Sequence, residues 1–357
     1  LTKFGFHHFI FALLPVSLLF LDNITEIPIN DIFIPLGISL IPVIILWALL
    51  TYFIGTKKSS VIISFLIILL LLFTYTRSSL IYHDIEEIRI FSRDEKKQED
   101  LRLKYKNPKI NFIVGDVRNP ESINWAMEGV DYVFQAAALK QVHTCEFYPM
   151  EAIRTNIIGS ENVLEAAINN GVKQIVVLST DKAVYPINTM GMTKAIMEKL
   201  AISKSRDRRA KANGLKVNIT RYGNVMCSRG SVIPLFIDQI LNNQPLTITD
   251  PDMTRFMMTL NDSVNLVLHA FENGKSGDTF IQKSPATTVG NLANALKSIF
   301  NSNVAINIIG ARHGEKGHEA LCSQEEMAKA CESESYYRIP ADMRDINYNN
   351  AIVDDFS

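Results

Sequence analysis

The chain has 357 residues, of which 47% are hydrophobic and 20% charged, and its formal net charge at pH 7 is −1. This composition excludes a wholly disordered chain and argues against a nucleic-acid-binding protein that relies on a global basic field. The 4 cysteines are too few for a disulfide-stapled scaffold, and no C-x-x-C pair offers ligands for structural zinc. We therefore expect no metal site, no nucleic-acid partner and a reducing compartment.

Residues 1–80 form a hydrophobic segment in which charged residues are rare. Within it, residues 33–54 carry no charge, and this stretch is long enough to cross a hydrocarbon core of about 30 Å. Apolar runs at 9–21 and 61–78 lie on either side of it. We predict a membrane segment of two or three transmembrane helices over residues 1–80.

Short apolar strands alternate with amphipathic helices from His83 onward, which is typical of an α/β fold with a parallel sheet. Ligands bind at the carboxyl ends of the strands in such sheets. Side chains that follow predicted strands, among them Arg93, Asp116 and Thr180, are therefore candidate site residues. Strands are predicted at 87–93, 109–117, 130–138, 173–180 and 216–225, and helices at 156–169 and 189–203.

The glycine-rich turn that opens a dinucleotide-binding sheet is absent from its expected place. A G-x-x-G-x-x-G-like turn lets the backbone approach the pyrophosphate at a helix N-terminus. Residues 1–82 contain only Gly5, Gly37 and Gly55, each isolated in hydrophobic sequence. The expected fold is a Rossmann-like parallel sheet that lacks its first strand and phosphate loop, followed by a small C-terminal substrate-binding part.

The run Leu178–Leu200 (LSTDKAVYPINTMGMTKAIMEKL) resembles the active-site segment of extended short-chain dehydrogenase/reductases. In that superfamily a Ser or Thr after a strand joins a Y-x-x-x-K on the next helix. Here Met190 stands at the Tyr position, four residues before Lys194 and on the same helix face. This variant is similar to UDP-N-acetylglucosamine 4,6-dehydratase/5-epimerases of bacterial capsule and O-antigen synthesis. The resemblance spans residues 84–350, the predicted enzyme domain, through FSRDEKKQ, GDVR, AAALKQV, CEFYPMEA, RYGNVMCSRGSVIPLF, LTITDPDMTRFMMT and RHGEK.

The resemblance implies 4,6-dehydration of a UDP-N-acetylhexosamine, with C5 or C4 epimerisation through a transient 4-keto sugar. Oxidation at C4 acidifies the C5 proton, so a base and an acid must lie side by side at the ring. The resemblance implies Lys182 as the base and Asp181 as the acid that assists loss of the C6 hydroxyl. Thr180 would bind the 4-hydroxyl and Lys194 the nicotinamide ribose. The Met190 thioether cannot accept the hydroxyl proton, so we expect it to pack and leave that proton to Lys182, Thr180 or a water.

The cofactor implied is a nicotinamide dinucleotide. Arg93, after the second strand of the usual fold, could accept a 2′-phosphate, so we expect NADP rather than NAD. Asp116 fits a contact to the adenine amino group, and the small residues Ala136 and Ala137 allow close approach. Arginine suits the substrate's diphosphate because its fork pairs two oxygens. Candidate substrate-binding residues are Lys140, Asn224, Arg255, Arg312 and Glu315.

Three interpretations remain open. The chain is a membrane-tethered dehydratase/epimerase, a UDP-sugar 4-epimerase, or a non-catalytic remnant or chimeric join unable to bind the dinucleotide. Expected partners are the nucleotide sugar, a membrane and a second copy of the chain. We expect the bacterial inner membrane with the enzyme domain in the cytoplasm, although Lys57 and Lys58 would place it outside by the positive-inside rule.

Overall fold

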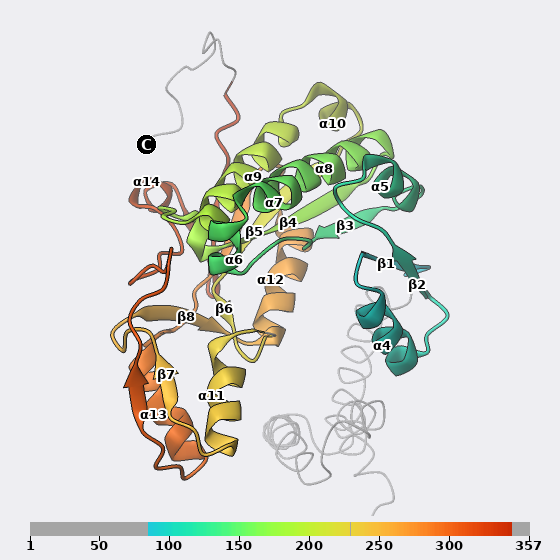
Figure 1. Ribbon diagram of the computed structural model, residues 1–357. Helices are drawn as coiled ribbons and strands as arrows, with labels where there is room; N and C mark the ends of the chain where they lie inside the picture. Colours follow the sequence, from blue (N-terminus) through green and yellow to red (C-terminus); the bar gives the residue numbers. More distant parts are fainter. Residues whose placement is uncertain (1–84, 229, 345–357) are drawn as a thin grey trace, which may run out of the picture. The chain divides into compact units, whose positions relative to one another are not determined.

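The computed structural model describes residues 85–228 and 230–344 (Figure 1). The chain divides into two units, Leu1–Ile88 and Arg89–Ser357, and nearly all described residues belong to the second. The three predicted membrane spans and the glycines of the first 82 residues lie outside the described part. Between residues 85 and 344, none of the described helices combines the length and hydropathy that crossing a bilayer requires.

A six-stranded sheet lies at the centre of the second unit and confirms the predicted α/β fold. Its strands, in spatial order, are β12 (Cys331–Glu332), β13 (Tyr336–Ile339), β9 (Thr279–Gln282), β5 (Lys216–Tyr222), β4 (Gln174–Thr180) and β3 (Tyr132–Gln135). The last four pair in parallel, whereas β13 and β12 add an antiparallel edge. Consecutive residues of β4 are buried, as expected for a strand covered on both faces.

Helices cover both faces of this sheet (Figure 1). α8 (Gly159–Asn169) and α9 (Thr189–Ser205) pack on one face, and α12 (Leu260–Asn273) packs on the other. Fully buried side chains such as Leu164 and Met197 fill the space between α8, α9 and the sheet. Shorter helical segments that contact α9 are α6 (Val142–Phe147), α7 (Pro149–Ala152), the π-helical η2 (Ile153–Ile158) and α10 (Arg208–Ala212).

A smaller βαβα segment precedes the main sheet. It consists of β1 (Ile88–Ser92), α4 (Glu95–Tyr105), β2 (Ile110–Val114) and α5 (Pro120–Ala126). β1 and β2 form a two-stranded sheet, to which no other described strand is paired. Asp94 caps α4 by accepting a 3.0 Å hydrogen bond from Lys97 N, and buried Gln98 donates to Ile113 O at 2.8 Å. These bonds hold α4 against the end of the pair, where the predicted residues Arg93 and Asp116 lie.

The C-terminal part has a hydrophobic core of its own, built around Phe236 and Ile248. Its elements are β6 (Asn224–Val225), α11 (Val232–Leu241), β7 (Leu246–Ile248), β8 (Thr254–Met258), β10 (Ala286–Thr288), α13 (Val289–Ile299), β11 (Ile306–Ile308) and α14 (Gln324–Met327). β6, β8 and β10 form one small sheet, and β7 and β11 form another. The chain therefore passes from the main sheet into the small sheet between β5 and β6.

Most observed elements follow the predictions, although the helix predicted over 156–169 begins within the π-helical η2, and two strands differ informatively. The strand predicted over 216–225 is split at Gly223, where a Cβ atom would lie 2.8 Å from the Phe256 carbonyl oxygen. The strand predicted over 130–138 ends at Gln135, because its side-chain oxygen accepts a 3.1 Å hydrogen bond from Ala137 N and turns the chain out of the sheet. In both places a specific tertiary or side-chain contact overrides the β-propensity of the local sequence.

Candidate functional site

Three polar side chains meet at the carboxyl end of β4, where the 3₁₀ turn η3 (Asp181–Ala183) begins. The Thr180 hydroxyl donates to Asp181 Oδ1 at 2.9 Å, and Lys182 Nζ donates to the same oxygen at 3.0 Å. The Asp181 side chain is fully buried, while that of Lys182 remains 17% exposed. A buried carboxylate requires such partners. The Lys182 amine is therefore the member of this group that reaches the surface of the site.

The N-terminus of α9 is held tightly against this strand end. A Cβ atom at Gly191 would lie 2.1 Å from the Lys182 carbonyl oxygen, so only glycine permits this approach. Asn188 caps the helix by accepting a 2.7 Å hydrogen bond from Gly191 N, and its amide donates to Gly314 O at 2.7 Å. One capping residue therefore links α9 to the loop that contains Gly314.

A cavity of about 570 Å³ lies beside Lys182, between the strand end and the C-terminal part. Its volume falls in the range of small-molecule sites. Apolar side chains such as Ile233 and Phe236 form part of its wall. The five predicted substrate-binding residues all line it: Lys140, Asn224, Arg255, Arg312 and Glu315.

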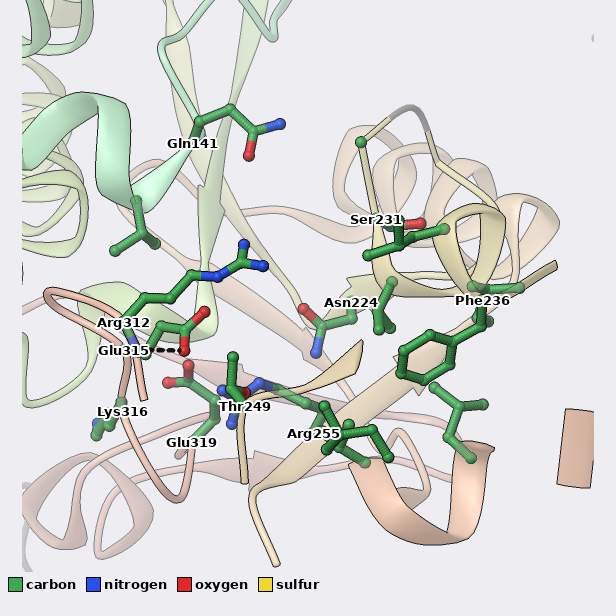
Figure 2. Close-up of a pocket in the computed structure, with 18 of the residues that line it drawn as sticks. Gln141, Asn224, Ser231, Phe236, Thr249, Arg255, Arg312, Glu315, Lys316 and Glu319 are labelled. Atoms are coloured by element: carbon green, nitrogen blue, oxygen red, sulfur yellow. Dashed lines mark hydrogen bonds between the residues drawn. The ribbon is translucent and has the colours of Figure 1, made fainter. Parts of the chain in front are cut away.

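The polar groups of the cavity come from opposite sides (Figure 2). Arg312 and Glu315 lie on one side, where Arg312 N donates to Glu315 Oε2 at 3.0 Å. Asn224 lies on the other side, and its side-chain nitrogen is buried without a hydrogen-bond partner among the described residues. Arg255 donates from Nη1 to Gly317 O at 3.2 Å at the base. Two guanidinium groups and an unpaired amide suit a polar anionic ligand.

Glu319 also lines this cavity and was not among the predicted site residues. Its side chain is 1% exposed, and Glu319 Oε1 lies 3.4 Å from Lys182 Nζ. It follows the predicted RHGEK motif by only three residues, but nothing in the local pattern indicates a contact with residue 182. The neighbouring His318 pairs with Thr254 in a β-bridge, which fixes this part of the loop.

A second cavity, of about 520 Å³, is lined by four of the predicted cofactor-binding residues, Arg93, Asp116, Ala136 and Ala137. Arg93 Nη1 lies 3.5 Å from Asp116 Oδ2, whereas Arg118 Nη2 lies 2.7 Å from the same oxygen. Hydrogen bonds from Arg118 lower the pKa of Asp116 to about 2. Asp116 is thus an ionised acceptor at neutral pH, at the position predicted for the adenine amino group.

The fifth predicted cofactor residue, Lys194, lines neither of these cavities. It is 5% exposed, and its Nζ donates to Leu178 O at 2.7 Å. Burial lowers the pKa of Lys194 to about 8. Met190 is buried in a small hydrophobic cluster with Cys145 and Ala152. Both residues therefore lie in the layer beneath the site, and their assigned roles remain predictions.

A family model described as "Polysaccharide biosynthesis protein" matches residues 75–341. Curated relatives of high similarity carry the name UDP-glucose 4-epimerase. The protein from Rickettsia rickettsii (strain Sheila Smith) is 65% identical over 274 residues, which cover 77% of this chain and 80% of that protein. The protein from Rickettsia felis (strain ATCC VR-1525 / URRWXCal2) is 64% identical over the same length, with the same coverage.

Solved structures share the fold. Pen from Bacillus thuringiensis is 40% identical with a TM-score of 0.70, covering 72% of this chain and 82% of that one. DesIV, a dTDP-glucose 4,6-dehydratase from Streptomyces venezuelae solved with NAD and TYD bound, is 20% identical with a TM-score of 0.61, covering 69% and 81%. The second likeness bears on the fold alone. The α/β sheet described above is thus the Rossmann-like fold of such epimerases and dehydratases.

Proposed function

Because this chain belongs to the polysaccharide biosynthesis protein family, within the short-chain dehydrogenase/reductase nucleotide-sugar epimerases and dehydratases, we propose that it interconverts a UDP-hexose and its C4 epimer. The observation that carries this proposal is the 65% identity, over 80% of its length, to a protein named UDP-glucose 4-epimerase. The 4-epimerase interpretation is therefore preferred to the 4,6-dehydratase implied by the sequence resemblance.

The proposed reaction leaves the sugar with no net oxidation. The C4 hydrogen leaves as a hydride and the 4-hydroxyl proton passes to a base, which produces a 4-keto sugar. Hydride return to the other face of C4, with the proton restored to oxygen, completes the inversion. We assign the proton to the Lys182 amine in its neutral form, since it is the group of the strand-end cluster that lines the cavity. Asp181 and Thr180 hold that amine in place.

A nicotinamide dinucleotide, when bound, would accept and return the hydride. Arg93, Asp116, Ala136 and Ala137 would hold its adenosine end in the second cavity, which fits the small residues and the acceptor found there. We propose NAD, the cofactor named for two solved structures with this fold, DesIV and the UDP-glucose 4-epimerase of Thermus thermophilus. NADP, expected from Arg93 alone, is the alternative that the test below distinguishes.

A second candidate function is 4,6-dehydration of the same class of substrate. It is favoured by the direct contact between Asp181 and Lys182, at 3.0 Å. Dehydration needs a base for the C5 proton and an acid for the C6 hydroxyl on neighbouring groups. This carboxylate and this amine are neighbours, with the amine facing the cavity, so the two candidates share one site and differ in product.

The test incubates the purified full chain with UDP-glucose or UDP-N-acetylglucosamine and NAD, and identifies the products by NMR and mass spectrometry. A C4 epimer of unchanged mass supports the proposal, and a product lighter by one water supports dehydration instead. NADH and NADPH titrations, followed by nicotinamide fluorescence, report cofactor binding independently of turnover. Absence of binding up to about millimolar concentration, with no product, would overturn both candidates and support the non-catalytic interpretation.

The cellular setting stays a prediction. We propose that the product serves synthesis of a bacterial surface polysaccharide and that the enzyme domain, residues 84–350, lies in the cytoplasm. A membrane segment over residues 1–80 and assembly with a second copy remain parts of this proposal. Membrane fractionation and light scattering of the purified full chain test them.

A further inference from the structure

Lys182 lies between two buried carboxylates rather than one. Its Nζ atom is 3.0 Å from Asp181 Oδ1 and 3.4 Å from Glu319 Oε1. The two acidic side chains are 0% and 1% exposed. Asp181 precedes Lys182 directly in the chain, whereas Glu319 comes from a distant loop of the C-terminal part.

The loop that carries Glu319 is fixed to β8. His318 forms a parallel β-bridge with Thr254, and Thr254 N donates to Gly317 O at 3.0 Å. The Thr254 hydroxyl lies 3.0 Å from His318 Nδ1. Three consecutive contacts therefore determine where residue 319 lies. Figure 2 shows Glu319 on the same side of the cavity as Glu315 and Arg312.

This cluster of charged side chains destabilises the fold unless a ligand or the reaction makes use of it. Asp181 Oδ2 and Glu319 Oε2 are both buried without a hydrogen-bond partner among the described residues. Burying a carboxylate oxygen without a partner destabilises the fold. The arrangement is therefore poorly explained as a stabilising ion pair, and the unpaired oxygen of Glu319, which lines the cavity, suits a ligand or a mobile proton.

We propose that Glu319 is a positioning residue that holds the Lys182 amine at the cavity wall. The inference rests on the proposed function, in which neutral Lys182 takes the proton of the sugar hydroxyl. A negative charge beside an ammonium favours the protonated form. With Asp181 Oδ1 at 3.0 Å and Glu319 Oε1 at 3.4 Å, the amine is held by two carboxylates.

Other charged groups face the same cavity from the elements packed around Lys182. They are Lys140 and His143 near α6, Arg255 on β8, and Arg312, Glu315 and Lys316 on the loop before Glu319. Among the described residues, only Asp181 and Glu319 form ion pairs with Lys182. A substitution that removes the Glu319 carboxylate therefore tests the ion pair with Glu319 while the ion pair with Asp181 is kept.

The experiment compares the full chain with Glu319→Gln and Glu319→Asp, and uses Glu325→Gln as a matched control. Glu325 is an exposed carboxylate on α14 that bonds to Tyr185 and does not line the cavity. Each protein is treated briefly with acetic anhydride across a pH series, and acetylation of Lys182 is quantified by peptide mass spectrometry. Only the neutral amine reacts, so the midpoint of labelling reports its protonation without requiring turnover. The acidic limb of the pH profile of kcat is measured in parallel.

For Glu319→Gln we expect Lys182 to be labelled more readily at a given pH and the acidic limb of kcat to change, because the amine loses a carboxylate oxygen 3.4 Å away. Glu319→Asp should restore part of the wild-type value, and Glu325→Gln should leave both unchanged. An unchanged labelling midpoint in Glu319→Gln would overturn the role of Glu319, even if the enzyme turns over. If the wild-type chain epimerises no UDP-sugar but labelling of Lys182 still differs between wild type and Glu319→Gln, the positioning role is upheld and the proposed function is overturned. If Glu319→Gln does not fold, Glu319→Ala takes its place, and a labelling midpoint in that variant equal to wild type overturns the proposal.

Discussion

At the scale of single residues, the buried amine of Lys194 makes the stability of the fold depend on pH. Burial disfavours its ammonium form and lowers its pKa to about 8, from 10.5 in the unfolded chain. Below about pH 8 both states hold the proton, so the folded state bears the full cost of the buried charge. Between the two values the unfolded chain binds more protons, so stability rises with pH.

We therefore predict that Lys194→Met removes this pH dependence. The wild type should gain roughly 3 kcal/mol in its free energy of unfolding, relative to the variant, between pH 8 and pH 10.5. Urea unfolding of both proteins at a series of pH values measures the difference. Parallel stability curves for the two proteins would show that the amine of residue 194 is not buried in this way.

Lys182 gives a second test at this scale. Lys182→Arg keeps the positive charge beside Asp181 and Glu319, but a guanidinium does not lose its proton in proteins. Epimerisation should fall by roughly 10²- to 10⁴-fold, the usual contribution of a general base. NADH binding and thermal stability should stay close to wild type. The matched control is Lys173→Arg, at an exposed lysine paired with Asp131; retention of turnover in Lys182→Arg would remove Lys182 as the base.

At the scale of elements, the contact between α9 and η3 determines the shape of the strand end. Glycine to alanine in a helix ordinarily stabilises, by about 1 kcal/mol. At Gly191 the added Cβ atom would lie 2.1 Å from the Lys182 carbonyl oxygen, so the sign should reverse. Gly191→Ala should lose about 1–3 kcal/mol of stability and reduce kcat, because α9 must move away from η3.

Chemical denaturation and steady-state kinetics check this prediction together. Met192→Ala, one residue along the same helix and 48% exposed, serves as the control for general effects on α9. A Gly191→Ala variant as stable and as active as wild type would contradict the close packing of the two elements.

At the scale of the whole molecule, the cavity of about 570 Å³ lies between the main sheet and the C-terminal part. A ligand that binds only the folded state stabilises it, by about 2.7 kcal/mol at a hundred times its Kd. UDP should therefore raise the melting temperature of the wild type. Arg312→Met should abolish most of this increase without lowering the melting temperature of the free protein, since Arg312 is exposed and lines the cavity.

Differential scanning fluorimetry with and without UDP measures this effect. Arg154→Met is the control, because Arg154 is an exposed arginine paired with Glu151 outside the cavity. An equal UDP-dependent shift in Arg312→Met and Arg154→Met would exclude Arg312 from nucleotide binding.

Local sequence predicted those parts of the fold and site whose contacts are local. β4 contains the apolar run Ile175–Leu178, and Asp181 and Lys182 are adjacent in the chain, so their contact followed from the end of one strand. Because ligands bind at the carboxyl ends of parallel strands, the sequence also predicted that Arg93 and Asp116 line one site. Glu319 was missed because its position depends on the bridge between His318 and Thr254, which no local pattern indicates.

The short loop from Arg312 to Glu319 lines the cavity at both of its ends. One end carries the arginine proposed to meet the nucleotide, and the other carries the carboxylate that contacts the amine of Lys182. A substitution that moves this loop should therefore affect both the arginine and the carboxylate. Divergence in nucleotide preference among relatives should therefore be accompanied by changes in turnover, and a chimera that receives this loop from a relative should inherit both traits together.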